Sequence, residues 1–170
     1  MPRIHRRTFL GRSAGVTFGA ALCSVPGLVL GDRTFSHAQS PQNPDNKLMD
    51  ADVRALRSLA QTYFDAAYEM DADKFASIFD PSSSVTKVGD DGNVGVTPIA
   101  MWLAAVRNIK APKQQGLERR DQILSIDVER ELALVKLRLQ IPPRYFTDML
   151  SCLKVNGTWK IAQKVMTSKT

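Results

Sequence analysis

Residues 144–166 read RYFTDMLSCLKVNGTWKIAQKVM and give the clearest indication of the fold of this chain. Two runs rich in apolar, β-branched and aromatic residues flank the dipeptide Asn156-Gly157, which tolerates the positive φ angles of a two-residue type I′ turn. The stretch therefore predicts an antiparallel β-hairpin that turns at this dipeptide.

One polar residue, Asp148, interrupts an apolar row of the first strand. Because side chains alternate between the two faces of a strand, it shares its face with Phe146, Leu150 and Cys152. An ionised carboxylate in such a row must be paired, hydrated or protonated. The same alternation predicts that one face of the second strand carries Trp159, Ile161, Gln163 and Val165.

The hairpin sequence FTDMLSCLKVNGTWKIAQK (146–164) resembles the C-terminal hairpin of the nuclear-transport-factor-2-like (SnoaL-like) superfamily, most closely its putative lumazine-binding branch. Residues 63–85, YFDAAYEMDADKFASIFDPSSSV, resemble the first helical hairpin of that superfamily, so the resemblance covers about 50–168. It implies an α+β fold in which a cone-shaped, curved antiparallel sheet wraps around about three helices as a cystatin-like roll. A pocket is expected at the wide end of the cone. The branch has no assigned activity, so function must be argued from residues.

The rest of the domain agrees with this α+β architecture. Hydrophobic periodicity predicts one long and two shorter helices, and alternating runs predict a short hairpin and two longer strands before a bend. In chain order these are a helix over 50–69, a helix capped by Asp71 or Asp73 and ended by Asp80-Pro81, strands 85–88 and 94–96, a helix from Thr97-Pro98, strands 119–128 and 132–141, and the bend at Pro142-Pro143.

The first 38 residues are typical of an export signal. Arg6 and Arg7 resemble the twin-arginine motif, a weakly apolar run follows, and residues 36–38 form an A-x-A-like site, so we expect cleavage after Ala38. A membrane anchor is the alternative, but the run is short and contains three glycines and a proline. A lipoprotein at Cys23 lacks the small residue expected before it. This predicts a signal over 1–38, a flexible lead-in over 39–49 and a domain over 50–170.

Export would use the twin-arginine machinery and deliver the domain to the periplasm or outside the cell, with no membrane attachment after cleavage. The net charge of +6 comes mainly from the leader, which contains five arginines and one aspartate and leaves 18 basic and 16 acidic residues. A basic cluster of Lys110, Lys113, Arg119 and Arg120 has no interleaved aromatic residues and is typical of a solvated face. We therefore expect no nucleic-acid binding.

Residue counts restrict the chemistry of the exported domain. Both histidines, His5 and His37, lie in the leader, so the domain has no imidazole to activate a serine or the remaining cysteine, Cys152. Histidine-ligated zinc is excluded on the same ground, and no metal or cofactor is expected. Cys152 is interpreted as a small core residue.

Tyr63 and Asp148 are the polar candidates for a site. Through the resemblance, Tyr63 falls on the oxyanion-stabilising tyrosine of ketosteroid isomerases, whereas the proton-shuttling aspartate falls on Lys87, so half of that machinery is missing. Asp148 is the best catalytic candidate, as a general base. It could instead anchor a polar ligand, or be a structural carboxylate bonded to a backbone amide or to a basic neighbour such as Lys164. We hypothesise that Tyr63, Trp102, Phe146 and Asp148 line one pocket.

Three functions remain open. The first and favoured one is an exported, cofactor-free domain that binds a small aromatic or heterocyclic molecule. The second is a small hydrolase, dehydratase or isomerase that uses Asp148 as general base. The third is a non-catalytic interaction module that dimerises through outward apolar residues such as Tyr145, Met149 and Leu153. A homodimer is compatible with the first function.

Overall fold

The computed structural model describes residues 44–169 of the chain. The predicted signal with Arg6, Arg7 and the cleavage site at Ala38 lies outside the described residues, as do positions 39–43 of the lead-in. Within 44–169, no helix combines the length and the apolar character that crossing a membrane requires.

The helices begin with α1 (Pro44–Glu69), which starts six residues before the predicted position. Proline suits the first turn of a helix, because the N–H it lacks would have no partner there. Helix α2 (Ala72–Ile78) is capped by Asp71, whose carboxylate accepts hydrogen bonds from the backbone N–H groups of Asp73 and Lys74 at 3.0 Å. Helix α3 (Ile99–Val106) and a single 3₁₀ turn, η1 (Lys113–Gln115), complete the helical part.

Six strands form one sheet in the order β2-β1-β6-β5-β4-β3. Their bounds are β1 (Phe79–Val88), β2 (Val94–Pro98), β3 (Arg120–Glu129), β4 (Leu132–Ile141), β5 (Arg144–Val155) and β6 (Thr158–Lys169). All neighbours are antiparallel except β1 and β6, which run parallel. Strand β1 starts before the predicted Val85, and the register between Phe79 and Ser84 is irregular. Pro81 lies in that irregular part, where its missing N–H breaks no regular ladder.

The predicted hairpin is formed by β5 and β6. Asn156 and Gly157 have φ angles of 50° and 78°, as a type I′ turn requires, and Val155 pairs with Thr158. The first strand has the predicted faces, since Asp148, Leu150 and Cys152 are all buried.

The predicted faces of β6 are wrong beyond Ile161. Cys152 pairs with Ile161 but Ser151 pairs with Gln163, so Ala162 is an extra residue in a β-bulge. Each side chain after the bulge therefore points to the opposite face from the one that simple alternation predicts. Gln163 and Val165 are exposed, whereas Lys164 is buried on the inner face.

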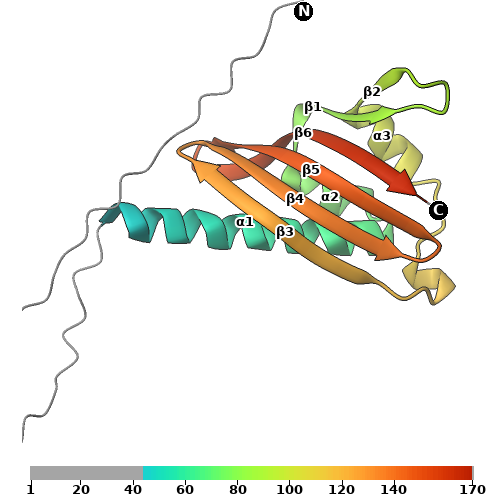
Figure 1. The fold of residues 1–170 in the computed structure, drawn as a ribbon, viewed down its shortest axis with the longest axis horizontal. Helices are drawn as coiled ribbons and strands as arrows, with labels where there is room; N and C mark the ends of the chain where they lie inside the picture. The colour runs from blue at the N-terminus through green and yellow to red at the C-terminus, as the bar shows by residue number, and fades with distance from the viewer. Residues whose placement is uncertain (1–43, 170) are drawn as a thin grey trace, which may run out of the picture. The chain divides into compact units, whose positions relative to one another are not determined.

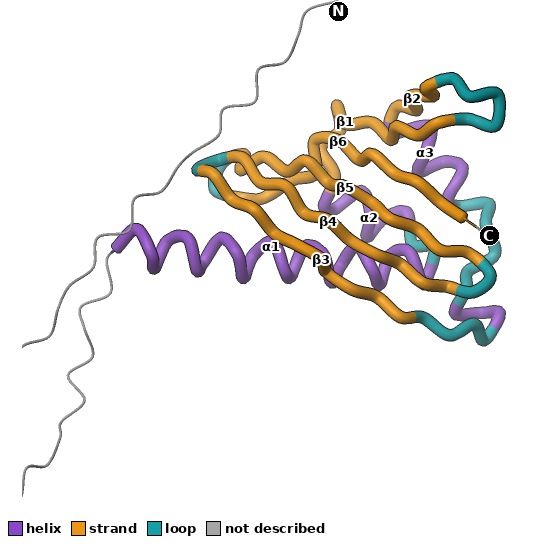
Figure 2. Tube along the Cα trace, viewed as in Figure 1, coloured by secondary structure: helices purple, strands orange, loops and turns teal. Residues whose placement is uncertain are grey.

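The helices cover one face of a curved sheet, as predicted (Figure 1). In the trace the strands form one layer with α1 running along it, and α2 and α3 lie toward one end (Figure 2). The core between the layers includes Leu56 and Tyr63 of α1 and Leu137, Leu150 and Ile161 of the sheet, each at most 1% exposed. The structure thus confirms the α+β class with a curved sheet and three helices.

Candidate ligand cavity

A cavity of about 410 Å³ lies between the helices and the inner face of the sheet. This volume falls within the range of pockets that hold small molecules. All four residues that we hypothesise to share a pocket line it, with Tyr63 from α1, Trp102 from α3, and Phe146 and Asp148 from β5. Much of the remaining wall is apolar, and includes Ala67, Met70, Phe75, Val85, Val106, Leu139, Ile141 and Met166.

Asp148 is held at the inner end of this cavity by two polar neighbours. The Tyr63 hydroxyl donates a hydrogen bond to Asp148 Oδ2 at 2.6 Å, and Lys164 Nζ lies 3.3 Å from the same oxygen. All three side chains are almost completely buried, and Asp148 is 1% exposed. The sequence left open a basic neighbour such as Lys164 as the partner of Asp148, and the structure shows this contact.

The Lys164 ammonium also contacts aromatic rings. It lies 5.1 Å from the ring centroid of Trp102 and 5.3 Å from that of Tyr63, within the range of cation–π attraction. Phe75 supports Trp102 edge-on at 4.8 Å between centroids. Burial lowers the pKa of Lys164, and the charge of Asp148 offsets part of that effect.

The Tyr63 hydroxyl keeps its proton. Burial raises its pKa well above the ordinary value, and the neighbouring Asp148 carboxylate raises this pKa further. Because that proton is donated to Asp148, the hydroxyl is not free to donate to a substrate oxygen. The arrangement therefore differs from the oxyanion-stabilising role that the resemblance would give Tyr63.

Asp148 Oδ1 is the unusual atom of the site. It is buried, yet no hydrogen-bond donor of the described residues reaches it. A buried acceptor without a partner costs about 1–3 kcal/mol, more when it is charged. Since Asp148 lines the cavity, an N–H or O–H group of a molecule in the cavity could supply the missing hydrogen bond.

Two cationic residues, Lys87 of β1 and Arg144 of β5, also line the cavity, and both are exposed. The exposure of Lys87 gives no support to its replacing the missing aspartate of ketosteroid isomerases. Among residues 44–169, no three His, Cys, Asp or Glu side chains gather closely enough to hold a metal ion. Cys152 lies away from the cavity wall in the core, where burial raises the pKa of its thiol to about 12.

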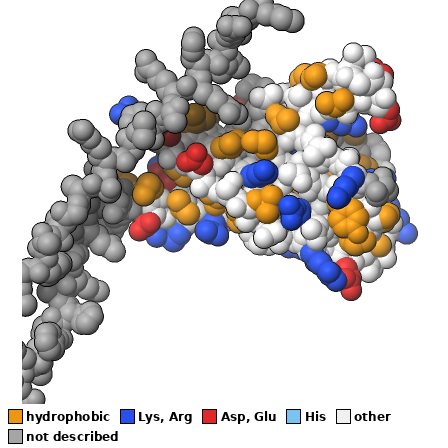
Figure 3. Space-filling view, viewed as in Figure 1, with side chains coloured by type: hydrophobic (Ala, Val, Ile, Leu, Met, Phe, Trp, Pro, Cys, Tyr) orange, Lys and Arg blue, Asp and Glu red, His pale blue; other side chains and the backbone are white. Residues whose placement is uncertain are grey.

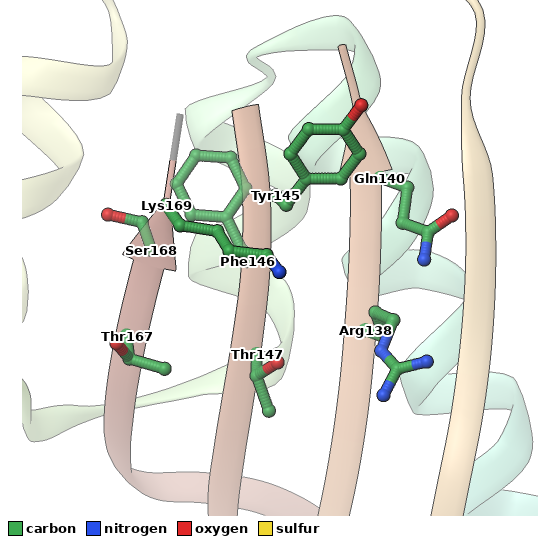
Figure 4. Close-up of a pocket in the computed structure, with 8 residues that line it drawn as sticks. All are labelled: Arg138, Gln140, Tyr145, Phe146, Thr147, Thr167, Ser168 and Lys169. Atoms are coloured by element: carbon green, nitrogen blue, oxygen red, sulfur yellow. The ribbon is translucent and has the colours of Figure 1, made fainter. Parts of the chain in front are cut away.

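A second depression, of about 510 Å³, lies on the sheet and includes outward residues of β4, β5 and β6. In Figure 4 the ring of Tyr145 leans toward Gln140 of the neighbouring strand, and Arg138 lies below them. Its lining residues are exposed or half-buried, and none is a buried ionisable group. The inner cavity is therefore the stronger candidate site.

The family model described as "Putative lumazine-binding" matches residues 51–167. The chain belongs to this family. The match covers α1 from Ala51 onward, α2, α3 and the whole sheet apart from the end of β6, and so includes every residue of the inner cavity.

Solved structures share the fold of this putative lumazine-binding domain. An NTF2-like protein of unknown function from Shewanella baltica is 20% identical, with a TM-score of 0.65 over 71% of this chain and 96% of that chain. A putative scytalone dehydratase from Novosphingobium aromaticivorans is 14% identical, with a TM-score of 0.57 over 74% and 89% of the two chains. A ketosteroid isomerase-like protein from Erwinia carotovora atroseptica is 11% identical, with a TM-score of 0.54 over 69% and 95%.

At these identities the structures establish the shared fold alone. No curated protein matches the chain.

Proposed function

We propose that this domain binds a small heterocyclic molecule in the inner cavity, with Asp148 as its polar anchor. The observation that carries the proposal is that Asp148 lines the cavity while its buried Oδ1 atom has no donor within the described part of the chain. Aromatic and aliphatic side chains around it suit a flat ring, and the carboxylate oxygen suits a ring N–H.

Lumazine itself fits this chemistry, because it is a fused bicyclic ring with N–H donors. The family description supports a ligand of this class. Binding without a cofactor is expected, since the anchor and the apolar wall are both supplied by the chain.

The test is a titration of the domain with lumazine, and with pterins and flavins in parallel, followed by thermal shift and ligand fluorescence. A ligand at 100 times its dissociation constant stabilises the folded state by about 2.7 kcal/mol. Ala105→Trp should abolish binding by filling the cavity, because Ala105 is an exposed residue of α3 that lines it. Ala104→Trp is the matched control, since Ala104 is exposed on the same helix but does not line the cavity.

Two results would contradict the proposal. One is the absence of any shift with all of these compounds at millimolar concentration. The other is binding that survives Ala105→Trp unchanged, which would place the ligand elsewhere.

A general base at Asp148 is the second candidate function, for a small hydrolase, dehydratase or isomerase. The place of Asp148 in the cavity wall favours it, because a base must lie within reach of a substrate proton. This candidate requires turnover that Asp148→Asn abolishes while circular dichroism shows an intact fold. Binding of a compound without any chemical change would favour the anchoring role instead.

We also propose that the domain is exported by the twin-arginine machinery and acts in the periplasm or outside the cell. The support is the sequence of the leader, with Arg6-Arg7 and the site ending at Ala38. Fractionation of an expressing bacterium should recover a periplasmic protein that begins at Gln39. The variant Arg6→Lys/Arg7→Lys should remain in the cytoplasm at full length, and export of this variant at the normal rate would contradict the proposal.

Homodimerisation through the outer face of the sheet is the last part of the proposal. Exposed apolar side chains on this face support it, and they include Leu134, Met149, Leu153 and Val165. If the domain is a non-catalytic interaction module, it needs only this surface. If it binds a small molecule, it can use the cavity for the ligand and this surface for the dimer.

A further inference from the structure

The rim of the inner cavity carries two positive charges at positions where the strands face inward. Lys87 lies two residues beyond the buried Val85 on β1, and Arg144 lies two residues before Phe146 on β5. Because alternate residues share a face, both cations are on the side of the sheet that faces the helices. Both line the cavity, and both are exposed, so they lie where it opens to solvent.

The charges of the cavity wall do not cancel. Deeper in the cavity, Asp148 and Lys164 neutralise each other at 3.3 Å. Asp148 is the only acidic residue of the lining, and neither Lys87 nor Arg144 has an ion pair with any residue that the structure describes. An occupant of the cavity therefore meets two uncompensated positive charges at its mouth.

We propose that the ligand of this cavity is an anion, a flat aromatic or heterocyclic acid. Its acidic group lies at the rim beside Lys87 and Arg144, and its ring lies inside against Trp102. This inference rests on the proposed function and adds to it the charge of the ligand and its orientation.

Physical reasons favour this orientation over its reverse. A guanidinium offers a carboxylate two parallel hydrogen bonds, whereas the deep end offers the ligand a carboxylate oxygen that needs a donor. A cleft lined by one sign of charge between apolar walls also concentrates counter-ions at its mouth. An acid entering with its ring first satisfies both ends, and an acid entering with its charge first would place that charge beside Asp148.

The experiment uses two fluorescent probes that differ in charge. The dye 8-anilinonaphthalene-1-sulfonate is an anion, and N-phenyl-1-naphthylamine is its uncharged counterpart; both carry one N–H donor and fluoresce in apolar sites. Their affinities are measured for the wild-type domain, for Lys87→Gln/Arg144→Gln, and for Lys136→Gln/Arg138→Gln. The last variant is the matched control, because it removes the same two charges from exposed residues that do not line the inner cavity.

We expect Lys87→Gln/Arg144→Gln to weaken binding of the anionic dye about fivefold or more, as the loss of two partly screened charge contacts implies. Binding of the uncharged dye should change less than twofold, and the control variant should leave both affinities unchanged. The affinity of the anionic dye for the wild type should also fall with added salt.

Equal effects of the rim and control variants on the anionic dye, or no effect of the rim variant, would overturn the inference. The proposed binding function would still stand in that case if both dyes bind the wild type and neither binds Ala105→Trp. Failure of both dyes to bind the wild type would instead count against the proposed function, and the inference would fall with it.

Discussion

At the scale of single residues, Asp148 and Lys164 form a buried ion pair in the wall of the cavity. Each charge is tolerated inside because the other lies 3.3 Å away, with the Tyr63 hydroxyl and two aromatic rings completing the environment. Removing one partner of a buried pair leaves an uncompensated charge, which costs about 3–5 kcal/mol.

We therefore predict that Lys164→Met lowers the free energy of unfolding by about 3 kcal/mol. The double variant Asp148→Asn/Lys164→Met should recover much of that loss, because no charge then remains buried. Urea unfolding of Lys164→Met, Asp148→Asn and the double variant measures the coupling energy between the two residues. A double variant that loses the sum of the two single effects would show that the residues do not interact.

A second residue-scale prediction concerns Cys152. Only the thiolate reacts with alkylating agents, and burial raises the pKa of this thiol to about 12 in a side chain with 0% exposure. Iodoacetamide at pH 8 should therefore leave Cys152 unmodified in the folded protein and label it in urea, as peptide mass mapping would show. Labelling of Cys152 in the native protein at the rate of an exposed cysteine would contradict its assignment to the core.

At the scale of elements, the hairpin depends on the backbone of its turn. Gly157 has a φ of 78° and open space around it, so an added Cβ meets no atom and the cost arises from the backbone alone. We predict that Gly157→Ala destabilises the domain by about 1 kcal/mol. Gly95→Ala is the control, because Gly95 lies in β2 without a positive φ. Equal thermal stability of the two variants would contradict this account of the turn.

Glu69 joins three elements at the end of α1. Its carboxylate accepts hydrogen bonds from Lys113 of η1 at 2.8 Å and from Lys74 of α2. These contacts, with Lys113 the stronger cause, lower the pKa of Glu69 from 4.5 to about 2. The folded state thus binds the proton less tightly than the unfolded state, so the stabilisation is present above about pH 4.5 and is lost as the pH falls toward 2.

We predict that Glu69→Gln is less stable than the wild type at neutral pH and that the difference shrinks between about pH 4.5 and pH 2. Thermal unfolding of both proteins at several pH values measures this difference in stability. Glu131→Gln is the control for the loss of one acidic charge, since Glu131 is exposed and makes no salt bridge within 44–169. A difference that stays constant down to pH 2 would mean that the two lysines do not stabilise the carboxylate.

At the scale of the whole molecule, the outer face of the sheet is the proposed dimer interface. Figure 3 shows apolar side chains on this face among lysine and arginine side chains. Met149 is 40% exposed and Leu153 43% exposed there, and Lys136 of β4 pairs with Met149. A stable dimer buries about 1,000 Å² or more of surface, and we expect the exposed apolar side chains of this face to lie in that interface.

We predict that sedimentation of the domain at micromolar concentration shows a dimer and that Met149→Glu converts it to a monomer, because a carboxylate would be buried in the contact. Val88→Glu is the control, since Val88 is an exposed apolar residue on the β1–β2 hairpin. A wild-type monomer at high concentration would exclude this interface.

Features that depend only on neighbouring residues could be predicted from the sequence. The dipeptide Asn156-Gly157 specified the turn, and strand alternation placed Asp148 on the inner face, because both depend only on neighbouring residues. Helical periodicity predicted the helix that carries Tyr63 for the same reason.

Which side chains meet Asp148 depends on the tertiary structure. The bulge at Ala162 turns Lys164 inward, and the parallel pairing of β1 with β6 brings Lys87 to the cavity that Arg144 also lines. A bulge is set by how two strands fit around a curved core, and a parallel pairing joins segments that are distant along the chain. Neither leaves a periodic pattern in the sequence, so the fold could be predicted from residues while the charge of its cavity could not.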